Sequence, residues 1–190
     1  MWESLVGTVK TFAAVVMMIC LSGADRPKGI PVGDKVPDFT VIDLDGKSWK
    51  LSTLHEKAGL KERGPVVLTF WCSFCGSCRQ VESSLDKLAT ANERKAAVFA
   101  LDASAGESAD KVAKVARDKK LSLSILMDGE GQSADVFGTR HTTTTVVIDS
   151  QGVLRYCGQF EHGKQQYLKD ALAAVLAGDE VRVKKTPHHG

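Results

Sequence analysis

The stretch that decides the fold of this 190-residue chain is Val66-Val67-Leu68-Thr69-Phe70-Trp71-Cys72-Ser73-Phe74-Cys75-Gly76-Ser77-Cys78-Arg79. It opens with an apolar run that is long enough for a buried strand. It closes with two cysteines separated by two residues, and a polar, helix-forming segment follows over residues 79–91. This order predicts a strand, a short cysteine loop and a helix, with Cys75 at the helix N-terminus and Cys78 one turn further in.

That placement predicts redox chemistry for Cys75 and Cys78. The positive end of the helix dipole and the free backbone N–H groups at a helix N-terminus favour a thiolate over a thiol. A shielded Cys78 can then attack a mixed disulfide formed on Cys75. A Cys-x-x-Cys pair between a strand and a helix is typical of a dithiol–disulfide redox pair. The alternative is a structural disulfide or two buried thiols.

Around this stretch the sequence predicts strands that alternate with helices. An Asp-Gly turn at Asp45-Gly46 joins two short apolar-patterned runs, which indicates a hairpin over residues 39–51. The other expected elements are a short helix capped by Ser52 and ending near Leu60, a strand over 96–101, a helix over 108–119, a peripheral strand over 121–126, a short helix over 132–137, a hairpin over 144–157 and a closing helix over 164–177 that ends at Gly178. Helices alternating with buried strands predict a layered α/β domain.

Three motifs resemble the thioredoxin superfamily, and within it the TlpA/ResA-type thiol–disulfide oxidoreductases, which are related to the AhpC/TSA redoxins. Residues 70–79 resemble the pattern F-W-A-x-W-C-x-P-C-R, residues 32–39 resemble the lead-in G-x-x-A-P-x-F, and residues 144–152 resemble the hairpin T-T-F-L-I-D-x-x-G. The resemblance covers residues 32–177. It implies a three-layer α/β/α fold with a central mixed sheet and an N-terminal β-hairpin extension.

The resemblance also implies an enzyme that exchanges a Cys75–Cys78 disulfide with protein thiols and disulfides. Its only redox group would be that disulfide, with no further cofactor, and its electrons would come from a thiol reductant or a membrane donor. Substrate-binding positions would be Trp71, Phe74, Gly76, Ser77 and Thr143. Ser77 stands where relatives carry Pro, and Thr143 stands where they carry a cis-Pro. We therefore expect the peptide bond before Thr143 to be trans.

Four further residues are candidates for accessory roles. Cys72 extends the motif to Cys-x-x-Cys-x-x-Cys. It is either a small buried side chain, a third redox partner or a ligand for a soft metal ion. We expect no bound metal. Cys157 lies on a strand whose end the expected topology returns toward the redox loop. It would be either a relay that forms a disulfide with the site or a buried thiol. Glu82 and His141 are candidates for proton transfer. The alternative for Glu82 is a side chain on a solvated helix face, and the alternative for His141 is an exposed loop histidine.

Two other functions compete with this interpretation. One is a non-catalytic thioredoxin-fold module for binding or metal handling. The other is a peroxiredoxin-like thiol peroxidase, because residues 65–72 match P-x-x-x-T-x-x-C by count. In peroxiredoxins that string lies in the loop and first helical turn after the strand, whereas here it spans the expected strand itself.

Composition and the chain ends bound the remaining possibilities. The chain is 43% hydrophobic and 25% charged with a formal net charge of +2, so charge gives no argument for nucleic acid or a membrane surface. Residues 1–24 resemble a signal peptide that ends in Ser22-Gly23-Ala24, or else an anchor over residues 5–24. We therefore expect export to the periplasm or cell envelope, a linker over 25–31, the thioredoxin-like domain over 32–177 and a tail over 178–190.

Overall fold

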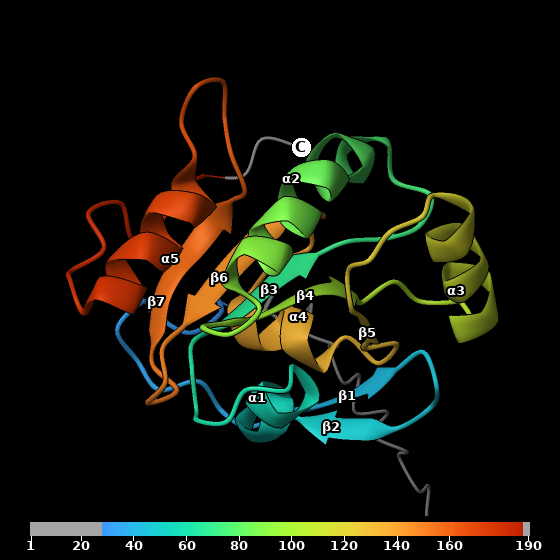
Figure 1. The fold of residues 1–190 in the computed structure, drawn as a ribbon, viewed down its shortest axis with the longest axis horizontal. Coiled ribbons are helices and arrows are strands. Elements are labelled where there is room, and N and C mark those ends of the chain that lie inside the picture. Colours follow the sequence, from blue (N-terminus) through green and yellow to red (C-terminus); the bar gives the residue numbers. More distant parts are fainter. Residues whose placement is uncertain (1–27, 188–190) are drawn as a thin grey trace, which may run out of the picture.

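The computed structural model describes residues 28–187 (Figure 1). The expected signal segment, and with it the start of the linker, lies outside these residues. Between Lys28 and Pro187 no helix combines the length and the apolar character that crossing a membrane requires.

The described chain folds into a seven-stranded sheet flanked by helices. Its elements in chain order are β1 (Thr40–Asp43), β2 (Ser48–Lys50), the 3-10 turn η1 (Leu51–Thr53), α1 (Leu54–Lys57), β3 (Val66–Phe70), α2 (Gly76–Asn92), β4 (Ala97–Asp102), α3 (Ala109–Asp118), β5 (Ile125–Met127), α4 (Gln132–Phe137), β6 (Thr144–Ile148), β7 (Leu154–Gln159) and α5 (Tyr167–Ala177).

The sheet is mixed, with the strand order β2-β1-β5-β4-β3-β6-β7. Strands β3, β4 and β5 are parallel, while the pairs β1–β2, β1–β5, β3–β6 and β6–β7 are antiparallel. This confirms the expected α/β fold with its N-terminal hairpin. The strand expected over 121–126 forms at Ile125–Met127, and the expectation that it is peripheral is wrong, because β5 pairs with both β1 and β4.

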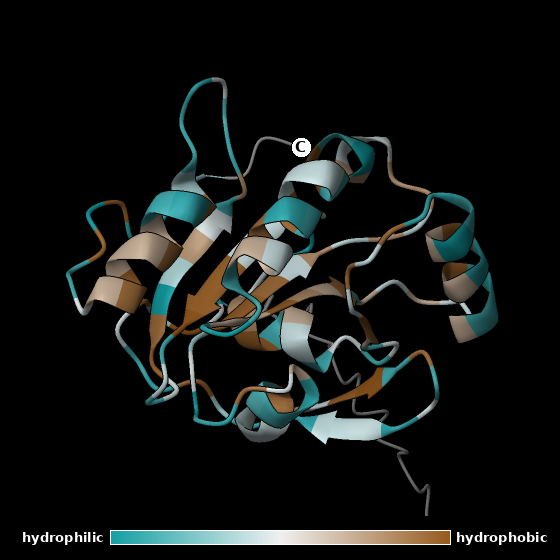
Figure 2. Cartoon of the chain, in the orientation of Figure 1, coloured by the Kyte–Doolittle hydropathy of each residue, from teal (hydrophilic) through white to brown (hydrophobic). Residues whose placement is uncertain are grey.

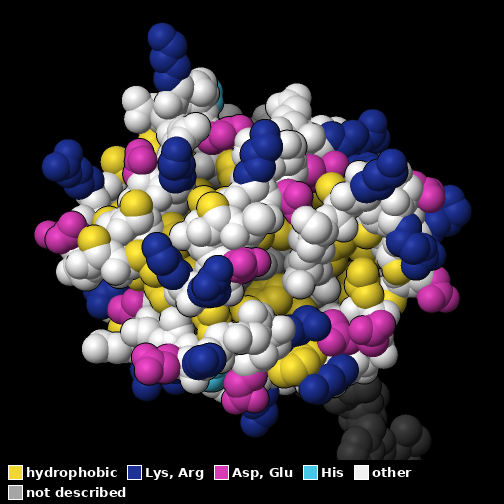
Figure 3. Space-filling model, in the orientation of Figure 1, with side chains coloured by type: hydrophobic (Ala, Val, Ile, Leu, Met, Phe, Trp, Pro, Cys, Tyr) yellow, Lys and Arg dark blue, Asp and Glu magenta, His cyan; other side chains and the backbone are white. Residues whose placement is uncertain are grey.

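Two apolar cores lie on opposite faces of the sheet and give it three layers. On β3, Val67 belongs to the core under α2, α3 and α5, while Val66 and Leu68 belong to the core with α1 and α4. A strand buried on both faces explains the continuous apolar run in the sequence. Figure 2 shows the hydrophobic central strands, and Figure 3 shows apolar side chains recessed between interspersed charges on the face that carries α2 and α5.

The segments at both ends of the described chain pack onto the domain. The amide of Ile30 donates to the carbonyl of Val136 at 2.9 Å, so the end of the expected linker is held beside α4. After Gly178, whose φ of 77° ends α5 as expected, Val181 is buried. Thr186 is also buried, and its hydroxyl accepts a hydrogen bond from the Gln159 amide at 2.7 Å. The expected tail is thus folded against β7 up to residue 187.

Two local expectations differ from the structure. Ser52 does not cap a helix; its amide and hydroxyl both donate to the Asp38 carboxylate, at 2.9 and 3.0 Å. The closing helix begins at Tyr167 rather than Lys164, because His162 and Gln165 form an isolated bridge in the preceding loop. Both differences arise from side-chain or loop contacts that local helix signals do not contain.

Replacement of Gly158 by Ala tests the contact between β7 and the C-terminal segment. An added Cβ would lie 2.1 Å from Thr186 Oγ1 and 2.8 Å from its amide nitrogen, so that segment must shift. We expect a loss of about 1–3 kcal/mol in the free energy of unfolding, the scale of overpacking, measured by urea denaturation. The matched control is Gly129→Ala, where nothing lies within 4 Å. Equal stability of the two variants would contradict this packing.

Candidate redox site

The junction between β3 and α2 sets the positions of Cys75 and Cys78. Cys75 is the N-cap of α2, with extended backbone angles, and its Sγ accepts a hydrogen bond from the Cys78 amide at 3.3 Å. The Thr142 hydroxyl lies 3.1 Å from the same sulfur. The Cys75 side chain is partly exposed, whereas Cys78 is fully buried under the helix. One sulfur therefore faces solvent with two hydrogen-bonding partners, and the other is shielded.

The two thiols have opposite acidities. Burial alone would raise the pKa of Cys75, but hydrogen bonds from the Thr142 hydroxyl, the Cys78 side chain and the backbone amides of Cys78 and Ser77 outweigh it and lower the pKa below that of an ordinary thiol. The pKa of Cys78 is raised to about 12, mainly by burial and in part by the neighbouring Cys75. The arrangement separates an accessible, more acidic thiol from a shielded, less acidic one.

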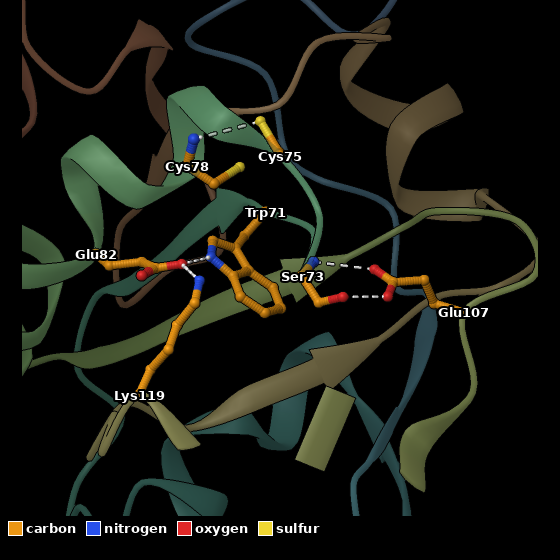
Figure 4. Close-up of polar contacts among 7 residues, drawn as sticks. All are labelled: Trp71, Ser73, Cys75, Cys78, Glu82, Glu107 and Lys119. Carbon is orange, nitrogen blue, oxygen red and sulfur yellow. Dashed lines mark hydrogen bonds and ion pairs between the residues drawn. The ribbon is translucent and has the colours of Figure 1, made fainter. Parts of the chain in front are cut away.

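Trp71 lies beneath this pair, with Glu82 beside its indole (Figure 4). The Glu82 carboxylate accepts hydrogen bonds from Trp71 Nε1 at 3.1 Å and from Lys119 Nζ at 2.7 Å. Glu82 is only 8% exposed, so the expected alternative of a solvated helix face is wrong. Its contacts place it in an ion pair that fixes the indole; proton transfer by Glu82 stays a prediction.

A second acidic contact holds the loop before Cys75. Glu107 accepts hydrogen bonds from the amide and the hydroxyl of Ser73 (Figure 4). Burial raises the pKa of the nearby Asp102, and its contact with the Glu107 carboxylate raises it further. Oδ2 of Asp102 is the one buried side-chain polar atom without a partner within residues 28–187. Protonated Asp102 can donate to the Glu107 carboxylate, which would give this atom a partner and leave Glu107 ionised for Ser73.

The loop before β6 supplies the other side of the site. Thr143 has a φ of 64°, and every peptide bond between Lys28 and Pro187 is trans, so the trans expectation is confirmed although the backbone there is left-handed. The Thr143 amide donates to the Phe70 carbonyl at 2.6 Å. This bend turns the Thr142 hydroxyl, rather than Thr143, toward Cys75.

A cavity of about 210 Å³ opens beside this loop and the ends of β3 and β4. His141 lines this cavity and is exposed. Its role in proton transfer and its alternative role as a loop histidine both stay predictions. The lining residues are Phe70, Trp71, Leu101, Ala103, Ser104, Ala134, Thr139, Arg140, His141 and Thr142. The cavity provides an open surface next to Cys75.

The remaining expected contact residues surround the opening of the site. Phe74 is 61% exposed, and Lys111 Nζ lies 5.6 Å from its ring centroid. Gly76 and Ser77 are exposed in the first turn of α2. An exposed aromatic ring beside an accessible sulfur is a suitable contact for a protein surface.

The structure brings Cys72 to the pair and keeps Cys157 apart. The sulfur atoms of Cys72, Cys75 and Cys78 all lie within 4.8 Å of one another. Cys157 pairs with Val146 in the sheet, level with Leu68, and its side chain belongs to the core on the opposite face from Cys78. The chain therefore does not return Cys157 to the redox loop, and burial raises the pKa of its thiol.

Comparison with known proteins agrees with this geometry. Residues 32–157 match the AhpC/TSA family, and the chain belongs to that family. It is 29% identical over 158 residues to the thioredoxin-like protein YneN of Bacillus subtilis, covering 77% of this chain and 88% of that protein. It is 28% identical over 126 residues to the thiol-disulfide oxidoreductase ResA of Geobacillus thermodenitrificans, covering 66% and 68%.

Solved structures show the same fold. A putative thiol:disulfide interchange protein DsbE from Chlorobium tepidum superposes with a TM-score of 0.65 at 23% identity, covering 78% of this chain and 99% of that chain. An uncharacterized conserved protein from Geobacillus kaustophilus gives a TM-score of 0.71 at 22% identity, covering 83% and 88%. The thioredoxin-like fold is confirmed, and the names of the sequence relatives confirm the predicted class, thiol–disulfide oxidoreductase.

Several residues of the site were missed by sequence reasoning. They are Thr142 before β6, Ser73 before α2, Asp102 and Glu107 at and after the end of β4, and Lys119 at the end of α3. Only Ser73 lies in the stretch around the two cysteines, and spacing along the chain carries no signal for the other four. The one usable signal was Asp102, a charged residue closing an apolar strand beside the central strand.

Removal of the Thr142 hydroxyl tests its role at Cys75. A hydrogen bond to a charged group contributes about 1.5–3 kcal/mol, and 1.36 kcal/mol corresponds to about one pKa unit. We expect Thr142→Val to raise the Cys75 pKa by about one unit or more, measured by the pH dependence of iodoacetamide alkylation with peptide mapping. Thr142→Ser keeps the hydroxyl and should titrate as the original protein does. A Val variant with unchanged titration would contradict the contact.

Substitution of Asp102 tests the shared proton. A raised carboxyl pKa means that the folded protein holds this proton more tightly than the unfolded chain does. Folding stability therefore falls as the pH rises from about 4, where an ordinary carboxyl group titrates, toward the raised pKa of Asp102. Asp102→Asn does not titrate, so its melting temperature relative to the original protein should increase between pH 4 and pH 8. Asp45→Asn, in an exposed Asp-Gly turn, should show no such trend. A pH-independent difference for Asp102→Asn would refute the shared proton.

Proposed function

We propose that this protein exchanges a Cys75–Cys78 disulfide with thiols and disulfides of other proteins. The observation that supports this most directly is the asymmetry of the pair, with Cys75 accessible and low in pKa at the N-cap of α2 and Cys78 buried one turn away. Such asymmetry defines which sulfur meets the substrate and which completes the reaction.

In the reducing direction the Cys75 thiolate attacks one sulfur of a substrate disulfide. A Cys75–substrate bond forms, the substrate S–S bond breaks, and the released substrate thiolate takes a proton from water. Cys78 then releases its proton to solvent and its thiolate attacks the Cys75 sulfur, so that the Cys75–Cys78 disulfide forms, the Cys75–substrate bond breaks and the second substrate thiolate leaves. The substrate gains two electrons and the enzyme dithiol loses two; the oxidising direction reverses each step.

The high pKa of Cys78 is suited to this order of events. Part of the elevation comes from the charge of Cys75 and from the hydrogen bond between the two side chains. Both contributions disappear once Cys75 is bonded to a substrate sulfur and carries no charge. The Cys78 thiol therefore becomes more acidic when the mixed disulfide exists, which is the only stage at which its thiolate is needed.

The contacts around the pair indicate a protein substrate. Exposed Phe74, the first turn of α2 and the cavity beside Thr142 together provide an open surface around the Cys75 sulfur. Electrons would come from a thiol reductant or a membrane donor. The N-terminal apolar segment that ends at Ser22-Gly23-Ala24 supports export to the periplasm or cell envelope.

A peroxidase function has less support. The peroxiredoxin-like string ends at Cys72, and its Thr69 lies within β3. Thr69 is fully buried and its hydroxyl is 2.9 Å from that of Thr145, while Cys72 is 2% exposed and its pKa is raised by burial and by Cys75. A buried thiol of raised pKa is a poor nucleophile for a peroxide.

Insulin-disulfide reduction with dithiothreitol tests the proposal. We expect Cys75→Ser to react at the uncatalysed rate, because no other accessible thiolate is available at the helix N-terminus. Cys78→Ser should accumulate a mixed disulfide between Cys75 and insulin, visible by non-reducing electrophoresis and mass spectrometry. Cys157→Ala is the matched control and should keep the full rate. Catalysis by Cys75→Ser at the original rate would overturn the proposal.

A further inference from the structure

We propose that the reduced protein binds one Cu(I) ion through the three sulfur atoms of Cys72, Cys75 and Cys78. This site goes beyond disulfide exchange, because exchange requires only two of the three cysteines. It gives a function to Cys72, which the redox mechanism does not use.

The geometry of the three sulfurs fits a single small cation. They come from the loop after β3 and the first turn of α2, and all lie within 4.8 Å of one another. Metal–sulfur bonds of about 2.3 Å in a trigonal site would place the sulfurs about 4 Å apart. The sulfur–sulfur distances must therefore shorten by about 1 Å or less, which small rotations of the three cysteine side chains can supply.

The ligand chemistry favours a soft, low-coordinate ion. Thiolates select Cu(I) and Zn(II) among the common metal ions, but zinc is almost always four-coordinate with protein ligands in structural sites. Within residues 28–187 the group consists of the three cysteines alone, without a fourth histidine or carboxylate. Three sulfurs match Cu(I), which is stable with three thiolate ligands.

Burial further supports a site that retains its ion. Cys72 is 2% exposed and Cys78 is fully buried, so water reaches the group only from the side of Cys75. That side provides the entry path, beside Thr142 and Phe74. All three sulfurs bind the ion as thiolates, so each cysteine that is still protonated releases its proton to solvent, and no electron is transferred. Because the ion occupies Cys75, metal binding and disulfide exchange exclude each other.

Anaerobic titration of the dithiothreitol-free reduced protein with Cu(I), in competition with a Cu(I)-specific colorimetric chelator, tests the site. We expect one ion per chain and a loss of affinity of at least about 100-fold in Cys72→Ala, since even changes outside the ligand set cost 10–100-fold. Cys72→Ser serves as a second variant, and Cys157→Ala as the matched control with unchanged affinity. X-ray absorption of the original protein should show three sulfur neighbours around copper.

The same variants separate this proposal from disulfide exchange. Cys72→Ala should reduce insulin at the original rate while failing to hold copper, which also shows that it is folded. Equal copper affinity in Cys72→Ala and the original protein would overturn the three-sulfur site. So would two sulfur neighbours in the absorption spectrum, or displacement of Cu(I) by an equal concentration of Zn(II).

Discussion

The site depends on the junction where β3 ends and α2 begins. Helix α2 leaves its first amide groups without intrahelical partners, and the Cys75 sulfur accepts one of them, from Cys78 at 3.3 Å. This contact caps the helix and stabilises negative charge on the sulfur at once. Because β3 is buried on both faces and paired with β4 and β6, the point at which the helix starts is fixed by the core rather than by the loop.

The groups around this junction divide into those that stabilise charge and those that hold the loop in place. Thr142 provides a second hydrogen bond to Cys75, from a loop that the left-handed backbone of Thr143 bends back toward β3. The Glu82–Lys119 ion pair fixes the indole of Trp71, and Glu107 holds Ser73. Cys78 stays buried and its pKa is raised, so the two thiols differ by environment although they share one helical turn.

The sequence predicted the layered fold because its strands are apolar on both faces, and it predicted the redox pair because strand, cysteine loop and helix are contiguous. It failed where contacts cross the chain. Thr142 rather than Thr143 meets Cys75, since only the backbone angle at Thr143 decides which side chain faces the sulfur. Cys157 lies on the opposite face of the sheet because strand register, not position along the chain, sets its direction.

A redox titration in glutathione buffers, with thiol trapping and peptide mapping, tests the central claim most directly. We predict one reversible two-electron couple whose oxidised form contains the Cys75–Cys78 disulfide. A potential near −270 mV, as in thioredoxin, would identify a reductant, and one near −120 mV would identify a strong oxidant. The absence of any reversible couple, or a disulfide that maps to Cys157, would contradict the account.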